Sequence, residues 1–194
     1  MLCLKPDANH KSMREKAWKL VEKYIKSPNL KKHALAVEAV MKKFGQKFGG
    51  DTKIWSLAGL LHDLDWEMTQ GSPQDHGKLA SEILKKEGWP EEIVKAVKTH
   101  NHVLGIKPET LLEKTLYSVE ELTGLITACA LVNPKKLSGV KTSSVLKKMK
   151  EKSFARGVNR EVILKGPKYL GLSLEEIIEM SLEAMKEIRD ELGL

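Results

Sequence analysis

Apolar residues recur three and four positions apart along nearly the whole chain, with lysine and glutamate between them. This spacing is typical of amphipathic helices, each with one face toward a core. No run alternates with a period of two over enough residues to indicate a strand. The pattern therefore predicts an all-α fold.

Capping residues, glycines and prolines give the expected boundaries of these helices. Ser12 with Glu15, and Ser173 with Glu176, form capping-box patterns, while Asn29, Asp51 and Asp75 are suited to the start of a helix. The helices are expected over residues 12–25, 29–48, 51–63, 75–88, 90–100, 108–132 and 173–188. The lysine-rich stretch over residues 137–160 predicts one short helix and a loop.

Length and composition fit one globular domain over residues 1–194. The chain is 41% hydrophobic and 30% charged, which is ordinary for a folded domain. Its longest apolar runs are well below the roughly 20 residues that a membrane span needs, and MLCLKPDANHKSM has no hydrophobic signal segment. We therefore expect a cytoplasmic protein without a membrane partner.

The net charge of +7 raises the question of nucleic-acid binding. The lysines are spread over almost every segment, and no basic stretch is interleaved with aromatic residues as in single-strand binders. Nucleic-acid binding is therefore not expected, whereas a diffuse positive surface suits a small anionic substrate. Cys3 and Cys129 provide no disulfide framework, and Cys129 is expected in the core. The sequence leaves the oligomeric state open.

The segment LAGLLHDLDWE, residues 57–67, places His62 and Asp63 together at the end of an apolar run. An ionised carboxylate buried without a partner costs several kcal/mol. A hydrogen bond, an ion pair or a metal ion must therefore compensate Asp63.

Further histidines lie at the ends of other expected helices, whereas His10 lies in a polar stretch and is expected to be solvated. His33, His76 and His100 each lie at the end of an apolar helix different from that of His62. Each alone is typical of a core histidine, but four at helix ends can converge, and imidazole with carboxylate suits a divalent transition metal. His102 lies two residues after His100, on the wrong side of a helix, and is a lesser candidate.

The order of these residues resembles the HD superfamily of metal-dependent phosphohydrolases. That pattern is a histidine near the start of one helix, a His-Asp doublet ending another, and an acidic residue on a later helix. The stretches LLHDLDWE, HGKLASEIL, TLYSVEELTGLI and KSFARGVNR are similar to a group of small HD-domain proteins without a characterised physiological role. The resemblance implies an HD-type helical core over about residues 29–132, followed by a basic loop and C-terminal helices over 133–194.

Carried over position by position, the resemblance implies that His33, His62 and Asp63 bind one metal ion. The fourth ligand of the family is an aspartate, and Glu120 stands at that position, in VEEL where the group more often has ADEL. Glutamate is one methylene longer, so Glu120 either ligates with a shifted backbone or is a surface carboxylate. Glu121 is the alternative ligand, although its helical direction differs by about 100°.

The resemblance also implies that His76 and His100 can hold a second ion, with Asp63 as the bridge. The expected cofactor is thus one or two divalent transition-metal ions, chosen from Fe, Mn, Co, Ni or Zn. Asp63 and Asp65 are the expected catalytic carboxylates. Asp65 and Asn101 can each orient a water or a ligand imidazole, and helix-end capping is the alternative for both.

A site of this kind activates water at neutral pH and clamps phosphoryl oxygens. The expected function is therefore hydrolysis of a nucleotide or another small phosphate ester. Lys152, Arg156 and Arg160 are expected to bind the phosphate, with the two arginines one turn apart if KSFARGVNR is helical; a solvated basic loop is the alternative. A non-catalytic sensor of metal or nucleotide, and a di-iron oxygenase of the same fold, also remain open.

Overall fold

A computed structural model describes residues 7–194, with side chains from Ser12 onward, and all its regular elements are helical. The α-helices are α1 (Asp7–Tyr24), α2 (Pro28–Phe48), α3 (Thr52–Leu61), α4 (Trp66–Thr69), α5 (Lys78–Lys86), α6 (Glu91–His100), α7 (Leu111–Leu131), α8 (Thr142–Lys150), α9 (Arg160–Leu170), α10 (Leu174–Glu187) and α11 (Arg189–Leu192). Two 3₁₀ turns are η1 (His102–Leu104) and η2 (Lys136–Gly139). The expected all-α fold is confirmed. None of the described helices is both long and apolar enough to span a bilayer.

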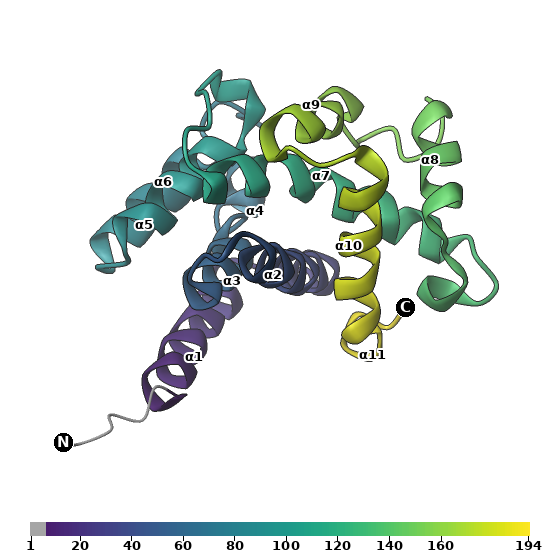
Figure 1. The fold of residues 1–194 in the computed structure, drawn as a ribbon. Coiled ribbons are helices and arrows are strands. Elements are labelled where there is room, and N and C mark those ends of the chain that lie inside the picture. Colours follow the sequence, from purple (N-terminus) through teal and green to yellow (C-terminus); the bar gives the residue numbers. More distant parts are fainter. Residues whose placement is uncertain (1–6) are drawn as a thin grey trace.

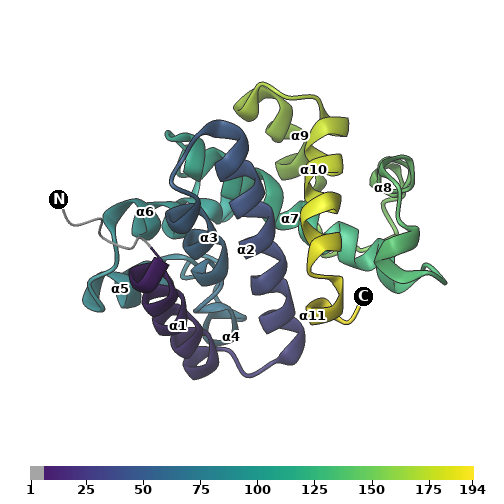
Figure 2. The same cartoon turned by 60° about the horizontal axis from the view of Figure 1, so that its bottom comes forward.

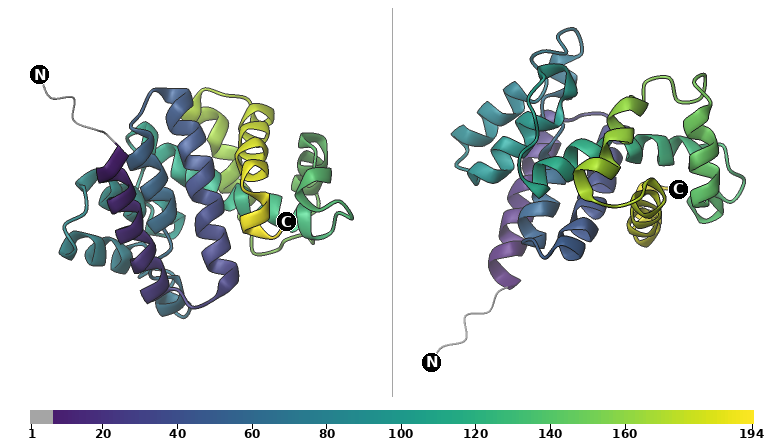
Figure 3. Two further views of the ribbon diagram at one scale, coloured as in Figure 1. Left: turned by 90° about the horizontal axis from the view of Figure 1, so that it is seen from below. Right: turned by 45° about the horizontal axis from the view of Figure 1, so that its top comes forward.

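Helix α7 runs across the molecule from α6 at one end toward α8 at the other (Figure 1). It contacts α2, α6, α9 and α10, so both the earlier and the later helices pack on it. α2 and α3 lie side by side, with α1 next to α3 (Figure 2). α8 lies at the opposite end of the molecule from α5 (Figure 3). The helices that carry the histidines are therefore grouped around the α6 end of α7.

A close approach between α2 and α3 sets the position of the His-Asp doublet. A Cβ atom added to Gly59 would lie only 2.7 Å from the Val37 carbonyl oxygen, so no other residue fits without a backbone shift. The neighbouring Leu57, Leu60 and Leu61 are fully buried. Burial of such side chains stabilises the fold by about 1.5–3 kcal/mol each, and it anchors the end of α3 where His62 and Asp63 follow.

Three expected helix starts are wrong. α1 begins at Asp7, so Ser12 lies inside the helix rather than at its cap. Ser27, not Asn29, caps α2, because the Ser27 hydroxyl accepts from the Leu30 N–H and Pro28 takes the first helical position. Asp75 lies in a turn before α5 and does not cap it.

The C-terminal third departs most from the sequence pattern. The capping box of Ser173 and Glu176 is present and confirms the expected start of α10. The short helix expected within 137–160 is α8, and residues 151–159 form a loop. α9 was not expected, because the sequence pattern assigned no helix to residues 161–172, and Pro167 lies inside it.

Candidate metal centre

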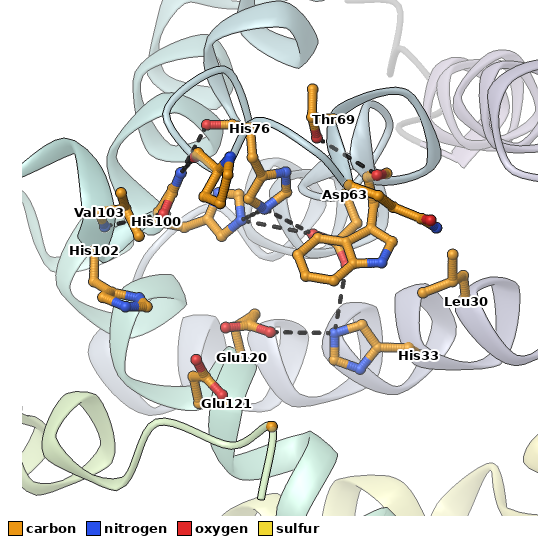
Figure 4. Close-up of a pocket in the computed structure, with 15 residues that line it drawn as sticks. Leu30, His33, Asp63, Thr69, His76, His100, His102, Val103, Glu120 and Glu121 are labelled. Carbon is orange, nitrogen blue, oxygen red and sulfur yellow. Dashed lines mark hydrogen bonds and ion pairs between the residues drawn. The ribbon is translucent and has the colours of Figure 1, made fainter.

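Four histidines from separate parts of the chain surround Asp63. His33 lies on α2, His62 and Asp63 directly follow α3, His76 lies in the turn before α5, and His100 is the last residue of α6. Figure 4 shows His33, His76 and His100 turned toward Asp63. The structure thus brings together the histidines that the sequence placed at helix ends.

The two carboxylate oxygens of Asp63 face different histidines. Oδ1 lies 3.3 Å from Nε2 of His62, 3.4 Å from that of His76 and 3.6 Å from that of His100. Oδ2 lies 3.8 Å from Nε2 of His33. Two groups have the spacing of metal ligands, one of His33, His62 and Asp63 and the other of Asp63, His76 and His100. Asp63 belongs to both groups, so it is placed to bridge two ions.

Hydrogen bonds on the far side of the rings fix the tautomers of three histidines. Nδ1–H of His62 donates to the Gly59 carbonyl at 2.7 Å, and Nδ1–H of His100 donates to that of Val97. Nδ1–H of His76 donates to Asp65 Oδ1 at 2.8 Å. In its neutral form each ring therefore presents an Nε2 lone pair to the centre, which is the usual arrangement of metal-binding histidine.

These lone pairs have no adequate partner within the protein. Nε2 of His62 is buried and makes no hydrogen bond. Nε2 of His76 and Nε2 of His100 lie 3.0 Å apart, and in this tautomer both are acceptors. A cation held by His76, His100 and Asp63 would satisfy both nitrogen atoms and would also compensate the charge of Asp63. The donor set therefore fits a divalent transition metal.

The same groups determine the ionisation of Asp63 in the metal-free protein. Burial alone would raise its pKa, but in the metal-free protein the charge of His62 and the hydrogen bonds of His100 and His62, when these rings carry a proton on Nε2, outweigh burial and hold the pKa well below its usual range. Burial lowers the pKa of His33, but the Glu120 and Asp63 carboxylates outweigh it and raise that pKa. Asp63 is therefore a ready anionic ligand, and His33 binds protons more readily than a free histidine.

Asp65 is fully buried behind His76. Its Oδ1 accepts from His76, and its Oδ2 accepts from the backbone N–H groups of Gly77 and Ala80, each at 2.8 Å. Gly77 has a φ of 78°, which favours glycine at this position. Asp65 does not line the cavity at the site, so it holds His76 in place rather than contacting a substrate.

Asn101 links the end of α6 to the turn that carries His76. Its side-chain amide donates to the carbonyls of Pro73 and His76, and its Oδ1 accepts from Val103 N–H. Asn101 was expected either to orient a water or ligand imidazole or to cap a helix end. The structure shows that it caps η1 and also holds the turn that carries His76.

The adjacent glutamates on α7 point in different directions, as helical geometry requires. Glu120 Oε1 lies 3.5 Å from Nε2 of His33, beside the first ligand group. Glu121 instead accepts the backbone N–H of Asn159 at 2.9 Å. Burial and the neighbouring Glu120 carboxylate raise the pKa of Glu121 to about 7, against the effect of the Asn159 N–H. Glu120 is therefore the glutamate that lies beside the candidate metal centre.

The expected arginine pair is not formed, because residues 151–159 are not helical. The Arg160 guanidinium donates to the backbone carbonyls of Lys148, Met149, Glu151, Phe154, Ala155 and Val158. It thus holds the loop to the end of α8. Lys152 and Arg156 are exposed, and Gly157 is the residue of this loop that lines the cavity.

A cavity of about 510 Å³ opens onto the ligands. It is lined by Leu30, His33, Asp63, Trp66, Thr69, Gln70, Pro73, His76, His100, Asn101, His102, Val103, Glu120, Glu121 and Gly157. His102 also lines the cavity. We expected it on the wrong side of a helix, but α6 ends at His100, so that expectation does not apply. Nε2 of His102 accepts a hydrogen bond from the Asn159 amide at 3.0 Å. Sequence reasoning missed Trp66, although it directly follows Asp65 in LHDLDWE.

Comparison with known families matches the chain to the HD domain over residues 30–131. The chain belongs to the HD-domain family. The matched range starts one residue after, and ends one residue before, the core expected from the resemblance.

Among curated proteins, the HD-domain chain is similar to proteins named Ribonuclease Y. It is 31% identical to that of Lawsonia intracellularis over 96 residues, which are 50% of this chain and 18% of that protein. It is 28% identical to that of Desulfotalea psychrophila over 96 residues, with the same coverage of both chains. The similarity therefore covers less than a fifth of these relatives. No solved structure matches the chain.

Proposed function

We propose that this HD-domain protein is a metal-dependent phosphohydrolase acting on a small phosphate ester such as a nucleotide. The observation that carries the proposal is the convergence of imidazole lone pairs on one buried carboxylate, with His62 Nε2 left unpartnered. Metal-dependent phosphohydrolases form the HD superfamily, which supports the same chemistry.

His33, His62 and Asp63 would hold one ion, with Glu120 beside it, and Asp63, His76 and His100 would hold the other. When bound, such ions lower the pKa of a coordinated water and polarise phosphoryl oxygens. Fe, Mn, Co, Ni and Zn all accept this ligand set.

The chain itself contributes fixed ligands and a cavity for the ester. Backbone carbonyls and Asp65 accept Nδ1–H, so that the neutral rings present Nε2 on the ligand side. Ligands with locked orientation need little reorganisation when an ion binds. The cavity is lined by Asp63 together with His33, His76 and His100, so a substrate has access to the ligands.

The similarity to Ribonuclease Y supports hydrolysis of a phosphate ester as the reaction class. The matched part is half of this chain and a small part of those proteins. The scattered lysines offer no basic track for RNA, so a small ester is the proposed substrate.

The proposal is tested by metal analysis and a screen of phosphate esters. Protein purified without chelator should contain one or two equivalents of a transition metal and should hydrolyse at least one ester with added Mn²⁺, Co²⁺ or Ni²⁺. Asp63→Ala should lose both ions, and turnover should fall by more than about 100-fold because even supporting residues of metal sites cost 10–100-fold.

Asp75→Ala is the matched control, because Asp75 is exposed and does not line the cavity. It should keep metal and turnover, and helicity by circular dichroism should be retained in both variants. Full turnover in Asp63→Ala would contradict the proposed site. Metal-loaded protein that binds nucleotides but hydrolyses no ester would support the sensor instead.

A further inference from the structure

Trp66 presents a large aromatic surface at the metal centre. It lines the cavity, yet its residue surface is 42% exposed. Its ring centroid lies 5.0 Å from that of His76, with the ring planes at 84°. Trp66 directly follows Asp65, which holds His76, so the indole and a proposed metal ligand are in direct ring contact beside one fixed carboxylate.

Three apolar side chains share the cavity with Trp66. Leu30, Pro73 and Val103 line the same cavity, and Val103 is itself 44% exposed. A volume of about 510 Å³ lies within the range of roughly 300–1,000 Å³ found for small-molecule sites. Such a cavity has room for a flat ring system in addition to a phosphoryl group at Asp63.

The charge of the wall limits how many phosphates a ligand can carry. No lysine or arginine is among the described residues that line the cavity, whereas Asp63, Glu120 and Glu121 are acidic. One phosphoryl group can be neutralised by the bound ions. Further phosphates would lie near the glutamates without a cation from the protein, and like charges repel.

We propose that Trp66 is a stacking platform that selects a phosphomonoester carrying a flat ring, such as a nucleoside monophosphate, over esters without a ring and over polyphosphates. The inference rests on the proposed function and names its substrate class. Stacked aromatic groups gain binding energy without base-specific hydrogen bonds. Hydrolysis adds water across the P–O ester bond and releases a nucleoside and inorganic phosphate.

The kinetic test compares AMP, ADP and ribose 5-phosphate, which has the sugar and phosphate but no ring. The native enzyme should favour AMP over both other compounds. Trp66→Ala should lower kcat/KM for AMP by roughly 10-fold, the order expected for one stacked base, and should lower that for ribose 5-phosphate by much less. Trp66→Phe should retain most of the preference.

Met68→Ala is the matched control, since Met68 lies on the same short helix, is 48% exposed and does not line the cavity. It should leave all three substrates unchanged. Equal efficiency with AMP and ribose 5-phosphate, a preference for ADP, or no effect of Trp66→Ala on AMP would overturn the inference while leaving the phosphohydrolase proposal intact.

A binding measurement separates the two proposals if no ester is hydrolysed. Titration of metal-loaded protein with AMP should quench tryptophan fluorescence to saturation, and ribose 5-phosphate should not. Trp66→Phe should abolish this quenching, although Trp18, Trp55 and Trp89 remain. Saturable quenching without hydrolysis supports the platform and contradicts the phosphohydrolase, whereas absence of quenching with native protein overturns the platform.

Discussion

The two ligand groups that share Asp63 differ in how firmly the protein holds them. The side chains of His76 and His100 are 9% and 2% exposed, and each donates Nδ1–H to a buried acceptor. In the other group His33 and its neighbour Glu120 are 18% and 22% exposed, and they meet each other at 3.5 Å. His62 of this second group is fully buried, and ligands of both groups line the cavity. The contrast between the two halves therefore lies in the greater exposure of His33 and Glu120.

One half of the centre therefore has ligands already oriented for a metal ion, and the other half has ligands that are easier to reach from solvent. The His76 half has its rings locked before an ion arrives, so little ordering accompanies binding there. The His33 half has side chains that interact with each other in the metal-free protein and must be redirected by an ion. We therefore expect tighter metal binding in the His76 half and easier exchange in the His33 half.

Asp65→Asn should cause the largest loss of metal affinity among these three variants, because it removes the support of His76 in the firmly held half. The amide removes the negative charge from the His76 partner and presents an NH₂ group to ring or backbone N–H donors. Metal affinity in this half should fall by about 10–100-fold. Elemental analysis and competition with a chelator measure it, and denaturant unfolding should show reduced stability.

Asp75→Asn, on the exposed turn before α5, is the control and should change neither quantity. If Asp65→Asn keeps both ions at native affinity, the contrast between the halves is wrong.

Glu120→Gln should have a smaller effect, confined to the exposed half. It removes the carboxylate beside His33 while leaving His76, His100 and Asp63 in place, so metal content should fall from two equivalents toward one. Glu120→Asp, which keeps a carboxylate at this position, should keep the second ion. Titration calorimetry with Mn²⁺ resolves the two binding steps.

Glu121→Gln serves as the control for position on α7, since Glu121 contacts Asn159 rather than His33. Two unchanged binding steps in Glu120→Gln would exclude Glu120 as a ligand.

Glu67→Gln should give the smallest effect, a small loss of thermal stability. It tests the contact between the start of α2, which carries His33, and α4. The Glu67 carboxylate accepts the N–H groups of Lys26 at 3.0 Å and Ser27 at 2.7 Å, which joins the start of α2 to α4. These bonds lower its folded-state pKa below 4.5. Its stabilisation is therefore present above the unfolded-state pKa and is lost as pH falls through the folded-state pKa.

Thermal melts of metal-free protein should thus show a slightly lower Tm for Glu67→Gln at pH 7. The difference should disappear at strongly acidic pH, where both chains carry a neutral side chain. An equal difference at both pH values would show that the charge of Glu67 is not involved.

The sequence predicted features that depend on neighbouring residues, such as helix ends. It did not predict the role of a side chain that is set by contacts with residues far away in the sequence. The end of α3 at His62 follows from an apolar run and a capped start, and the capping box of α10 is local in the same way. Arg160 carries the charge expected of a phosphate ligand, but the loop after α8 exposes carbonyls that it satisfies instead. His76 was assigned to a helix start, whereas its contact with Asp65 holds it in a turn.

The absence of a Cβ atom at Gly59 affects both the spacing of α2 and α3 and the position of the proton on His62. Its missing side chain lets α3 approach Val37, and its carbonyl holds the proton of His62 on Nδ1. Any larger residue must push the backbone outward and carry that carbonyl with it. A substitution that looks purely steric would therefore release the proton from Nδ1 and let it compete with the metal for Nε2.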